Sequence, residues 1–262
     1  MTAVDFAAFV DDLASVSGQA ILPFFRTAIA AADKSKGDAG FDPVTEADRA
    51  GEAVMRQMIK RTFPSHGIVG EEYGDERTGA EFVWVLDPID GTRSFISGLP
   101  VWGTLIGLLR NGSPCFGMMH QPFTGERFSG DGGNATWRGA SGATRTMRTR
   151  PCARLNEATI SATTPRMFTG QALEAYERVE NAARLARFGY DCYAYCMLAA
   201  GHMDLVIETG LKSYDIVALV PIIEGAGGVV TTWTGGPAAE GGAIVAAGDP
   251  RVHAEALALL NR

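Results

Sequence analysis

Apolar residues recur at helical spacing through most of the first sixty positions. Residues 4–31 place them on one broad face, which predicts an amphipathic helix that Pro23 kinks or interrupts. Thr45 begins a second periodic segment, which runs to about Phe63 and is ended by Pro64. The chain therefore opens with two predicted helices joined by a polar loop.

After the second helix the pattern changes to short apolar runs, which are typical of β-strands. Residues 66–72 and 81–87 each form such a run and end in acidic side chains. Residues 102–122 predict two strands joined by a tight turn at Asn111-Gly112, a dipeptide strongly favoured in two-residue hairpins. A further pair of strands is expected just after this hairpin. The first part of the chain therefore combines helices with a sheet.

Strands and helices alternate through the rest of the chain, as is typical of α/β layering. Between the two patterns, residues 138–154 are small and rich in arginine, which suggests a surface connection. We therefore divide the chain into an N-terminal α+β half, residues 1–150, and a C-terminal α/β half, residues 151–262. The predicted strands of the second half are residues 157–163, 186–190, 202–208, 229–233 and 243–248, and its predicted helices are residues 171–186, 191–201, 213–228 and 250–261.

Composition narrows the range of partners. The 262 residues, 46% hydrophobic and 20% charged, are typical of a folded protein with a substantial core. A net charge of −7 argues against nucleic acid or an anionic membrane surface as a partner. No segment approaches the roughly 20 apolar residues of a membrane span, and the acidic N-terminal stretch lacks the features of a signal peptide. We therefore expect a cytoplasmic protein whose four cysteines are free, buried thiols.

Two aspartates stand close together at the end of predicted strand 81–87. Asp87 and Asp90 flank Pro88 and Ile89, and two carboxylates held this close repel each other and lose solvation when buried. A tight turn at this sequence would aim both carboxylates at one point. Hard oxygen ligands a few ångströms apart suit Mg²⁺. The alternative is a capped turn at the end of a strand.

Three other acidic positions lie at the edges of predicted elements, and each has a purely structural alternative. Glu71, next to Glu72, ends a predicted strand, where paired acids are usually solvated. Asp48 follows Thr45 by three residues and fits a helix-capping box. Asp215 would lie in the first turn of a helix, where an acid complements the helix dipole. Acids placed in this way can also converge on one site.

Three segments carry most of this chemistry: IVGEE (residues 68–72), WVLDPIDGTRSF (residues 84–95) and SYDIVAL (residues 213–219). In this order and spacing they resemble the inositol monophosphatase superfamily of Mg²⁺-dependent, lithium-sensitive phosphomonoesterases. The likeness extends over nearly the whole chain, and DPIDGT after GEE is highly specific. The resemblance implies an α/β (α+β) fold, namely a layered αβαβα sandwich of the inositol monophosphatase and fructose-1,6-bisphosphatase type, and a homodimer.

Carried over residue by residue, the resemblance implies two to three Mg²⁺ ions in the site. Glu71, Asp87 and the backbone carbonyl of Ile89 would hold the first ion. Asp87, Asp90 and Asp215 would hold the second, and Glu71 would reach a weaker third ion through water. Paired cations of this kind activate a water molecule and stabilise the oxygens that enter and leave in an in-line displacement.

The same resemblance implies the catalytic and phosphate-binding residues. Thr92 and Asp48 would orient the attacking water, with Glu71 as the third catalytic residue. The backbone of Gly91 and Thr92 would hold the phosphate group of a small phosphate monoester. Arg93 departs from the neutral residue common in inositol-cleaving members, and it would contact phosphate or face solvent. No side-chain nucleophile is needed.

A few residues of the second half bear on the choice of substrate. Gly189 is followed by Tyr190 and Asp191, whereas inositol-cleaving members commonly have small residues there, and Glu208 occupies the position of the family's glutamate. A carboxylate in this place favours a cationic substrate over a neutral polyol, because a buried unpaired carboxylate is costly. Asp191 and Glu208 would then bind an ammonium or imidazole group, with Tyr190 or Tyr193 packed on the ring.

The pattern FISGLPVWGTLIGL (residues 95–108), together with GYDCYAY (residues 189–195), resembles the histidinol-phosphatase branch of the same family. This implies L-histidinol phosphate as the substrate, whose product carries an ammonium group and an imidazole. The alternative among enzymes is an inositol-1-phosphatase or a broad polyol monophosphatase, in which Asp191 merely caps the helix that follows it. A non-catalytic, metal-binding regulatory protein is the alternative from a different class.

Overall fold

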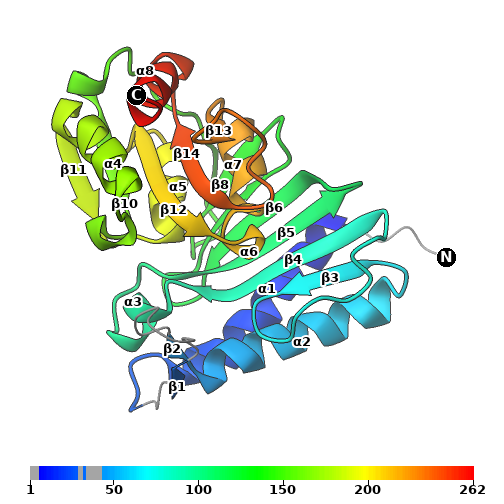
Figure 1. Ribbon diagram of the computed structural model, residues 1–262. Helices are drawn as coiled ribbons and strands as arrows, with labels where there is room; N and C mark the ends of the chain where they lie inside the picture. The colour runs from blue at the N-terminus through cyan, green and yellow to red at the C-terminus, as the bar shows by residue number, and fades with distance from the viewer. Residues whose placement is uncertain (1–5, 29–31, 34–42) are drawn as a thin grey trace.

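Two large β-sheets, a two-stranded ladder and three layers of helices make up the computed structural model, which describes residues 6–28, 32–33 and 43–262 (Figure 1). The larger sheet has the strand order β3-β4-β5-β6-β7-β8-β9; β3 pairs with β4 in parallel, and the later neighbours pair antiparallel. Its strands are β3 (Gly67–Gly70), β4 (Phe82–Asp90), β5 (Gly103–Arg110), β6 (Ser113–Gln121), β7 (Glu126–Gly130), β8 (Ala135–Arg138) and β9 (Thr144–Thr146).

The smaller sheet has the strand order β11-β10-β12-β14-β13. Strand β10 pairs in parallel with both β11 and β12, whereas β14 pairs antiparallel with both β12 and β13. Its strands are β10 (Thr159–Ala162), β11 (Leu185–Phe188), β12 (Leu205–Leu211), β13 (Val229–Thr232) and β14 (Gly242–Ala247), and a separate short ladder joins β1 (Ala32–Asp33) to β2 (Pro43–Val44).

The helices lie in three layers around these sheets, as Figure 1 shows. Helices α1 and α2 cover the outer face of the larger sheet, α5 to α7 lie between the sheets, and α4 and α8 cover the outer face of the smaller sheet. This order is the predicted αβαβα sandwich. The bounds are α1 (Phe6–Ile21), α2 (Glu46–Thr62), α3 (Thr92–Ile96), which follows β4, α4 (Gln171–Ala182), α5 (Cys192–Ala199), α6 (Ser213–Ile216), α7 (Leu219–Gly225) and α8 (Pro250–Leu260).

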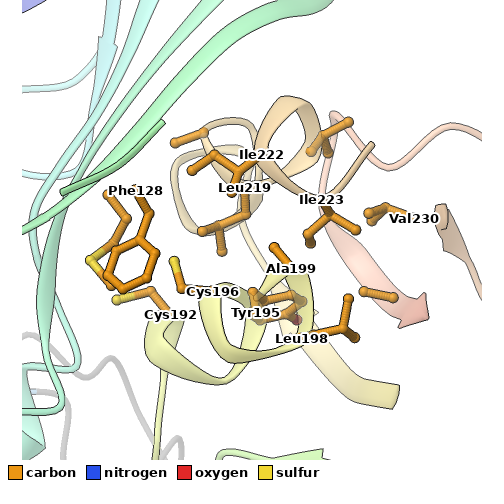
Figure 2. Close-up of a cluster of buried hydrophobic side chains, with 14 of the residues drawn as sticks. Phe128, Cys192, Tyr195, Cys196, Leu198, Ala199, Leu219, Ile222, Ile223 and Val230 are labelled. Carbon is orange, nitrogen blue, oxygen red and sulfur yellow. The ribbon is translucent and has the colours of Figure 1, made fainter. Parts of the chain in front are cut away.

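Both faces of the central strands are buried. In β5, Leu105 belongs to the core between the sheets, and its neighbour Ile106 belongs to the core under α1 and α2. Successive side chains of a strand point to opposite faces, so one strand supplies two cores. Figure 2 shows the core between the sheets, where Phe128 of β7 faces Cys192 and Cys196 of α5. This double burial explains why the strands appear as nearly continuous apolar runs.

A row of glycines lets the middle helical layer approach the larger sheet closely. Gly107, Gly117 and Gly130 are paired in register across β5, β6 and β7. A Cβ atom on Gly117 would lie 1.8 Å from the carbonyl oxygen of Ala218, just before α7. The helix backbone therefore packs directly on the strand backbone, without intervening side chains.

Several predicted elements are confirmed, and some differ at their ends. Asn111 and Gly112 have φ values of 51° and 79°, as a two-residue hairpin turn requires. Helix α2 follows its predicted cap, Thr45. Helix α1 ends at Ile21, earlier than predicted, and the chain continues as a 3₁₀ helix that contains Pro23. The outer ends of that predicted helix, and most of the polar loop after it, lie outside the described residues.

Two helix predictions of the second half were wrong in extent. Helix α4 ends at Ala182 because the chain beyond it forms β11, whose hydrogen bonds to β10 override the helical pattern. The predicted helix 213–228 is divided into α6 and α7. Pro221 lacks the N–H that would bond to the carbonyl of Val217, which accounts for the break.

The Arg-rich segment 138–154 is partly an exposed edge strand, β9, and partly a connection that buries Met147 and Cys152. The four cysteines are free, as predicted, and three of them are buried, whereas Cys115 is only partly buried. The division near residue 150 stays a prediction, although the larger sheet ends at Thr146 and the smaller begins at Thr159. None of the helices in the described part of the chain is long and apolar enough to cross a membrane.

Candidate functional site

A β-bulge at the end of β4 brings two aspartates to one side of the strand. Asp87 is opposite Leu105 on β5, whereas Asp90 is opposite Gly103, so three steps on β4 match two on β5. In a regular strand residues 87 and 90 would point to opposite faces, and the extra residue removes that alternation. The sequence predicted a tight turn at this place, but the strand continues through Asp90. The convergence of the two carboxylates is therefore a consequence of the bulge.

Asp215 completes an acidic cluster with these two residues. It lies on the short helix α6, where its Oδ2 accepts a hydrogen bond of 2.6 Å from the backbone N–H of Lys212. Asp87, Asp90 and Asp215 each offer a carboxylate oxygen within 4.8 Å of the others. Three oxygens at this spacing fit a hard divalent cation such as Mg²⁺.

The pKa values of the three carboxyl groups are raised. Burial is the main cause in each case, and repulsion between neighbouring carboxylates adds to it. For Asp215 the pKa rises to about 7, although the hydrogen bond from Lys212 opposes the change. A cation would offset the repulsion that the protein alone does not relieve.

Glu71 lies directly after β3, and its charge contributes to the raised pKa values of Asp87 and Asp215. It is not one of the three carboxylates whose oxygens lie within 4.8 Å of one another. The turn that carries Glu71 is fixed by a buried carboxylate of α2, that of Glu52. Glu52 accepts hydrogen bonds from the backbone N–H groups of Glu72, at 2.7 Å, and Tyr73, at 3.2 Å.

Asp48 serves two structural purposes at once. Its Oδ2 accepts hydrogen bonds from the backbone N–H and the hydroxyl of Thr45, at 2.8 Å and 2.6 Å, so the predicted capping box is present. Its Oδ1 is 3.4 Å from the hydroxyl of Thr92. That hydroxyl also lies 3.1 Å from the carbonyl oxygen of Ile89. The capping role and the predicted pairing with Thr92 therefore coexist.

The residues after Asp90 lie at the edge of the cluster. Gly91 has φ 90° and precedes α3, a conformation that favours glycine. Arg93 is exposed to solvent, and its charge opposes the rise in the pKa of Asp191. Arg93 thus lies near the carboxylate of Asp191.

A pocket of about 160 Å³ opens beside the cluster. Asp90 and Asp215 line it together with Asp191 and Glu208, the two acids expected to select the substrate. Glu208 is buried, and it accepts hydrogen bonds from the backbone N–H of Thr163 at 2.8 Å and from the hydroxyl of Tyr195 at 2.9 Å. Burial raises the pKa of Glu208, while the hydrogen bonds lower it.

Asp191 does not cap helix α5 through its side chain, although it holds the N-cap position. The first N–H of that helix, from Cys192, instead donates a 2.6 Å hydrogen bond to Oδ2 of Asp90. The carboxylate of Asp191 accepts a 2.8 Å hydrogen bond from the hydroxyl of Ser94. The alternative in which Asp191 is only a helix cap is therefore wrong.

The two tyrosines considered for ring stacking lie elsewhere. The Tyr193 ring packs against Phe128, and its hydroxyl donates to Glu126, so Tyr193 belongs to the core. The Tyr190 hydroxyl accepts a 2.9 Å hydrogen bond from Arg187, and neither tyrosine lines the pocket. Gly189 adopts φ 84° at the start of this loop.

Sequence reasoning missed the residues that hold these acids in place, which include Glu52 and Ser94. For Glu52 a signal existed, because Asp48, Glu52 and Arg56 recur every four residues on α2 and form one polar stripe that is buried. For Ser94 no local signal existed, because its partner is 97 residues away in the chain.

The comparison with known families decides what kind of protein carries this site. A model described as the inositol monophosphatase family matches residues 4–262. The chain belongs to the inositol monophosphatase family. It is therefore a phosphatase that hydrolyses phosphoric monoesters. The family is Mg²⁺-dependent, and the acidic cluster could hold such an ion.

The relatives that resemble this chain are named for different phosphatase activities. The chain is 44% identical to a bifunctional phosphatase, IMPL2, of the chloroplast of Arabidopsis thaliana, with 98% of this chain and 75% of the relative covered. It is 33% identical to a histidinol-phosphatase of Mycobacterium tuberculosis, over 84% of this chain and 85% of the relative. An inositol monophosphatase structure from Zymomonas mobilis matches with a TM-score of 0.86 and 37% identity, covering 98% of both chains.

Proposed function

We propose that this phosphatase hydrolyses L-histidinol phosphate to L-histidinol and phosphate, a step of histidine biosynthesis. The observation that carries the proposal is the pair of carboxylates, Asp191 and Glu208, that lines the pocket beside the acidic cluster. A cationic amino alcohol offers an ammonium group and an imidazole to such a pair, whereas a neutral polyol offers no positive charge to either carboxylate. The similarity to a histidinol-phosphatase supports the same substrate.

The proposal includes two to three Mg²⁺ ions in the acidic cluster. Glu71, Asp87 and the carbonyl of Ile89 would hold one ion, and Asp87, Asp90 and Asp215 a second. The chemistry that the ions supply is a lowered pKa for an attacking water and compensation of the phosphate charge. The three converging carboxylates and their raised pKa values support this assignment.

The remaining roles fall to groups of the chain. Oδ2 of Asp48 is already occupied by Thr45, so Oδ1 is left to accept a proton or a hydrogen bond through the hydroxyl of Thr92. This pair would orient the attacking water, with Glu71 as the third catalytic residue. The backbone N–H groups of Gly91 and Thr92 would hold the phosphate group.

Arg93 and the loop around Gly189 and Tyr190 complete the proposed substrate site. The charge of Arg93 acts on Asp191, so Arg93 would tune that carboxylate or approach the phosphate group. Gly189, with its positive φ, would let the chain turn toward the pocket. Tyr190 would lie at the outer edge of the substrate site.

A second candidate is hydrolysis of inositol 1-phosphate. It is favoured by the 37% identity to the Zymomonas mobilis inositol monophosphatase and by 34% identity to a probable inositol 1-monophosphatase, ImpA, of Mycobacterium tuberculosis. The acidic pocket counts against it. A non-catalytic metal-binding protein is a remote alternative, since such a protein would not need the Asp48–Thr92 pair.

The test is kcat/KM for L-histidinol phosphate and myo-inositol 1-phosphate, measured side by side with Mg²⁺ and with chelator. We expect a preference of about a hundredfold for histidinol phosphate, which equals roughly 2.7 kcal/mol of differential transition-state binding. Equal rates, or faster hydrolysis of inositol phosphate, would favour the second candidate. Turnover that survives chelation would contradict the metal assignment.

The proposal extends to a homodimer and to a cytoplasmic location, although the plant relative is named as chloroplastic. Sedimentation of the purified protein at micromolar concentration would give the oligomeric state.

A further inference from the structure

The backbone of Asp191 adopts a conformation that is unfavourable for a residue with a side chain. Its φ is 44° and its ψ is −137°, whereas the other residue of the pair that lines the pocket, Glu208, lies in strand β12 and has no positive φ. Strained residues of this kind persist only when surrounding contacts hold them, and they concentrate at functional sites. The contacts that hold Asp191 in this conformation therefore indicate its functional role.

Ser94 is the main holder of the Asp191 side chain. The serine lies on α3, is buried, and donates a 2.8 Å hydrogen bond to Oδ2 of Asp191. The carboxylate also lies against Gly91, where an added Cβ would be 3.0 Å from Cγ of Asp191. Thr163, which lines the same pocket, and the charge of Arg93 also lower the pKa of this carboxyl group.

Two hydrogen bonds tie the cluster segment to the loop that enters α5. One is the bond from Ser94 to Asp191, and the other runs in the reverse direction, from the N–H of Cys192 to Asp90. The second bond fixes the start of the helix without using Asp191. The carboxylate of Asp191 is therefore held in place for something other than capping, and it lines the pocket.

The charged residues that line this pocket, within the described part of the chain, are Asp90, Asp191, Glu208 and Asp215. Asp90 and Asp215 belong to the acidic cluster, which leaves Asp191 and Glu208 to face the substrate. Glu208 is fixed by Thr163 and Tyr195. Ser94 supplies the equivalent restraint for Asp191.

We propose that Ser94 is a specificity-positioning residue, whose hydroxyl holds the Asp191 carboxylate in the orientation that binds a cationic group of the substrate. This inference rests on the proposed function. Preorganised carboxylates bind better than mobile ones, because the ordering cost is met before the substrate arrives. Without the hydroxyl, Asp191 is free to turn toward Arg93 and away from the substrate.

The test compares wild type with Ser94→Ala, Ser94→Thr and Asp191→Asn. L-histidinol phosphate is the cationic probe, and myo-inositol 1-phosphate is the neutral one. We expect Ser94→Ala to lower the ratio of the two kcat/KM values about tenfold, mainly by raising KM for the cationic probe, and Ser94→Thr to restore it. Ser97→Ala, an exposed serine at the end of the same helix, is the matched control and should keep the wild-type ratio.

A double-mutant cycle decides whether Ser94 acts through Asp191. In an Asp191→Asn background, Ser94→Ala should change the ratio by less than about twofold, because the group that it positions has lost its charge. A full tenfold loss in that background would overturn the proposal, and so would an unchanged ratio in the single variant. A melting temperature for each variant separates misfolding from loss of specificity.

The outcomes for the two proposals are distinguishable. A wild-type preference for histidinol phosphate that Ser94→Ala leaves intact supports the proposed function and overturns this inference. A wild type without that preference overturns both. Calorimetric titration of L-histidinol alone into the same proteins gives a second readout that does not depend on turnover, and Ser94→Ala should weaken this binding about tenfold.

Discussion

At the scale of single residues, the site depends on a carboxylate, that of Glu52, which lies outside both the acidic cluster and the pocket. Glu52 is fully buried and accepts hydrogen bonds from the N–H groups of Glu72 and Tyr73 and from the Nε of Arg56, the last at 2.6 Å. A Cβ on Gly70 would lie 2.1 Å from Oε1 of Glu52, so the strand end and the carboxylate fit each other closely. This packing fixes the turn that carries Glu71.

Replacing Glu52 by glutamine should therefore damage both stability and metal binding. The amide NH₂ group turns a donor toward groups that are themselves donors, and Arg56 loses the negative charge of its buried partner. We expect Glu52→Gln to lower the free energy of unfolding by about 3 kcal/mol and to weaken Mg²⁺ binding about tenfold. Urea unfolding and calorimetric titration with Mg²⁺ measure the two effects.

Glu81→Gln is the matched control, because Glu81 also pairs with an arginine but is exposed to solvent. Its unfolding curve should stay near that of the wild type. Equal Mg²⁺ affinity in Glu52→Gln and wild type would show that the turn does not need this carboxylate.

The sequence predicted the acids of the cluster but not the residues that position them. Asp87 and Asp90 are recognisable because their neighbours Pro88, Ile89 and Gly91 form a short, distinctive motif. No sequence feature marks Ser94 as a positioning residue, because a serine at this place is equally compatible with an ordinary short helix. Its role depends on a contact across the fold, which spacing along the chain does not encode.

At the scale of elements, the acidic cluster is formed where strands and helices depart from regular geometry. The bulge of β4 aims two aspartates together, and the division between α6 and α7 leaves Asp215 on a helix of its own. The periodicity of apolar residues predicted the strand and the helical region. It did not predict the bulge, which depends on the register with β5. The break follows from Pro221, which the apolar periodicity alone does not take into account.

The glycine row of β5 to β7 gives a prediction at this scale. Gly117→Ala places a methyl group 1.8 Å from the carbonyl oxygen of Ala218, and both atoms belong to packed backbone. The helix must move away from the sheet, and we expect a loss of about 3 kcal/mol in the free energy of unfolding. Thermal and urea unfolding measure this loss.

Gly79→Ala serves as the control, because a Cβ there meets no atom within 4 Å and the glycine lacks a positive φ. That variant should unfold like the wild type. Equal stability of the two variants would mean that α7 tolerates a looser contact with the sheet than the glycine row indicates.

At the scale of the whole molecule, the acidic cluster joins the two halves of the chain. Asp87 and Asp90 come from the larger sheet, and Asp215 comes from a helix of the second half. Alternation of strands and helices predicted the layers, and the family resemblance predicted which acids meet. The distances and the crossed hydrogen bonds at the junction depend on how the two halves pack, which no local pattern specifies.

A metal held at this junction should stabilise the whole fold, and the effect should depend on pH. The pKa of Asp215 is raised to about 7, so without metal the folded protein binds a proton there that the unfolded chain has already released. The stability that this proton contributes is complete below the unfolded pKa of Asp215 and is lost as the pH rises toward 7. The metal-free protein should thus be less stable at pH 8 than at pH 6.

Mg²⁺ competes with that proton, so its stabilising effect should be larger at pH 8 than at pH 6. At a hundredfold excess over Kd, binding adds about 2.7 kcal/mol, which corresponds to a rise in Tm of roughly 5–10 °C for a chain of this size. Differential scanning calorimetry with Mg²⁺ and with chelator, at both pH values, measures the four melting temperatures. Asp215→Asn should reduce the difference between the two pH values, because one of the three carboxyl groups with a raised pKa is gone. A Tm that does not change with Mg²⁺ at pH 8 would contradict the assignment of the cluster as the metal site. An ion that binds Asp87, Asp90 and Asp215 together must stabilise the folded state, because unfolding separates these ligands.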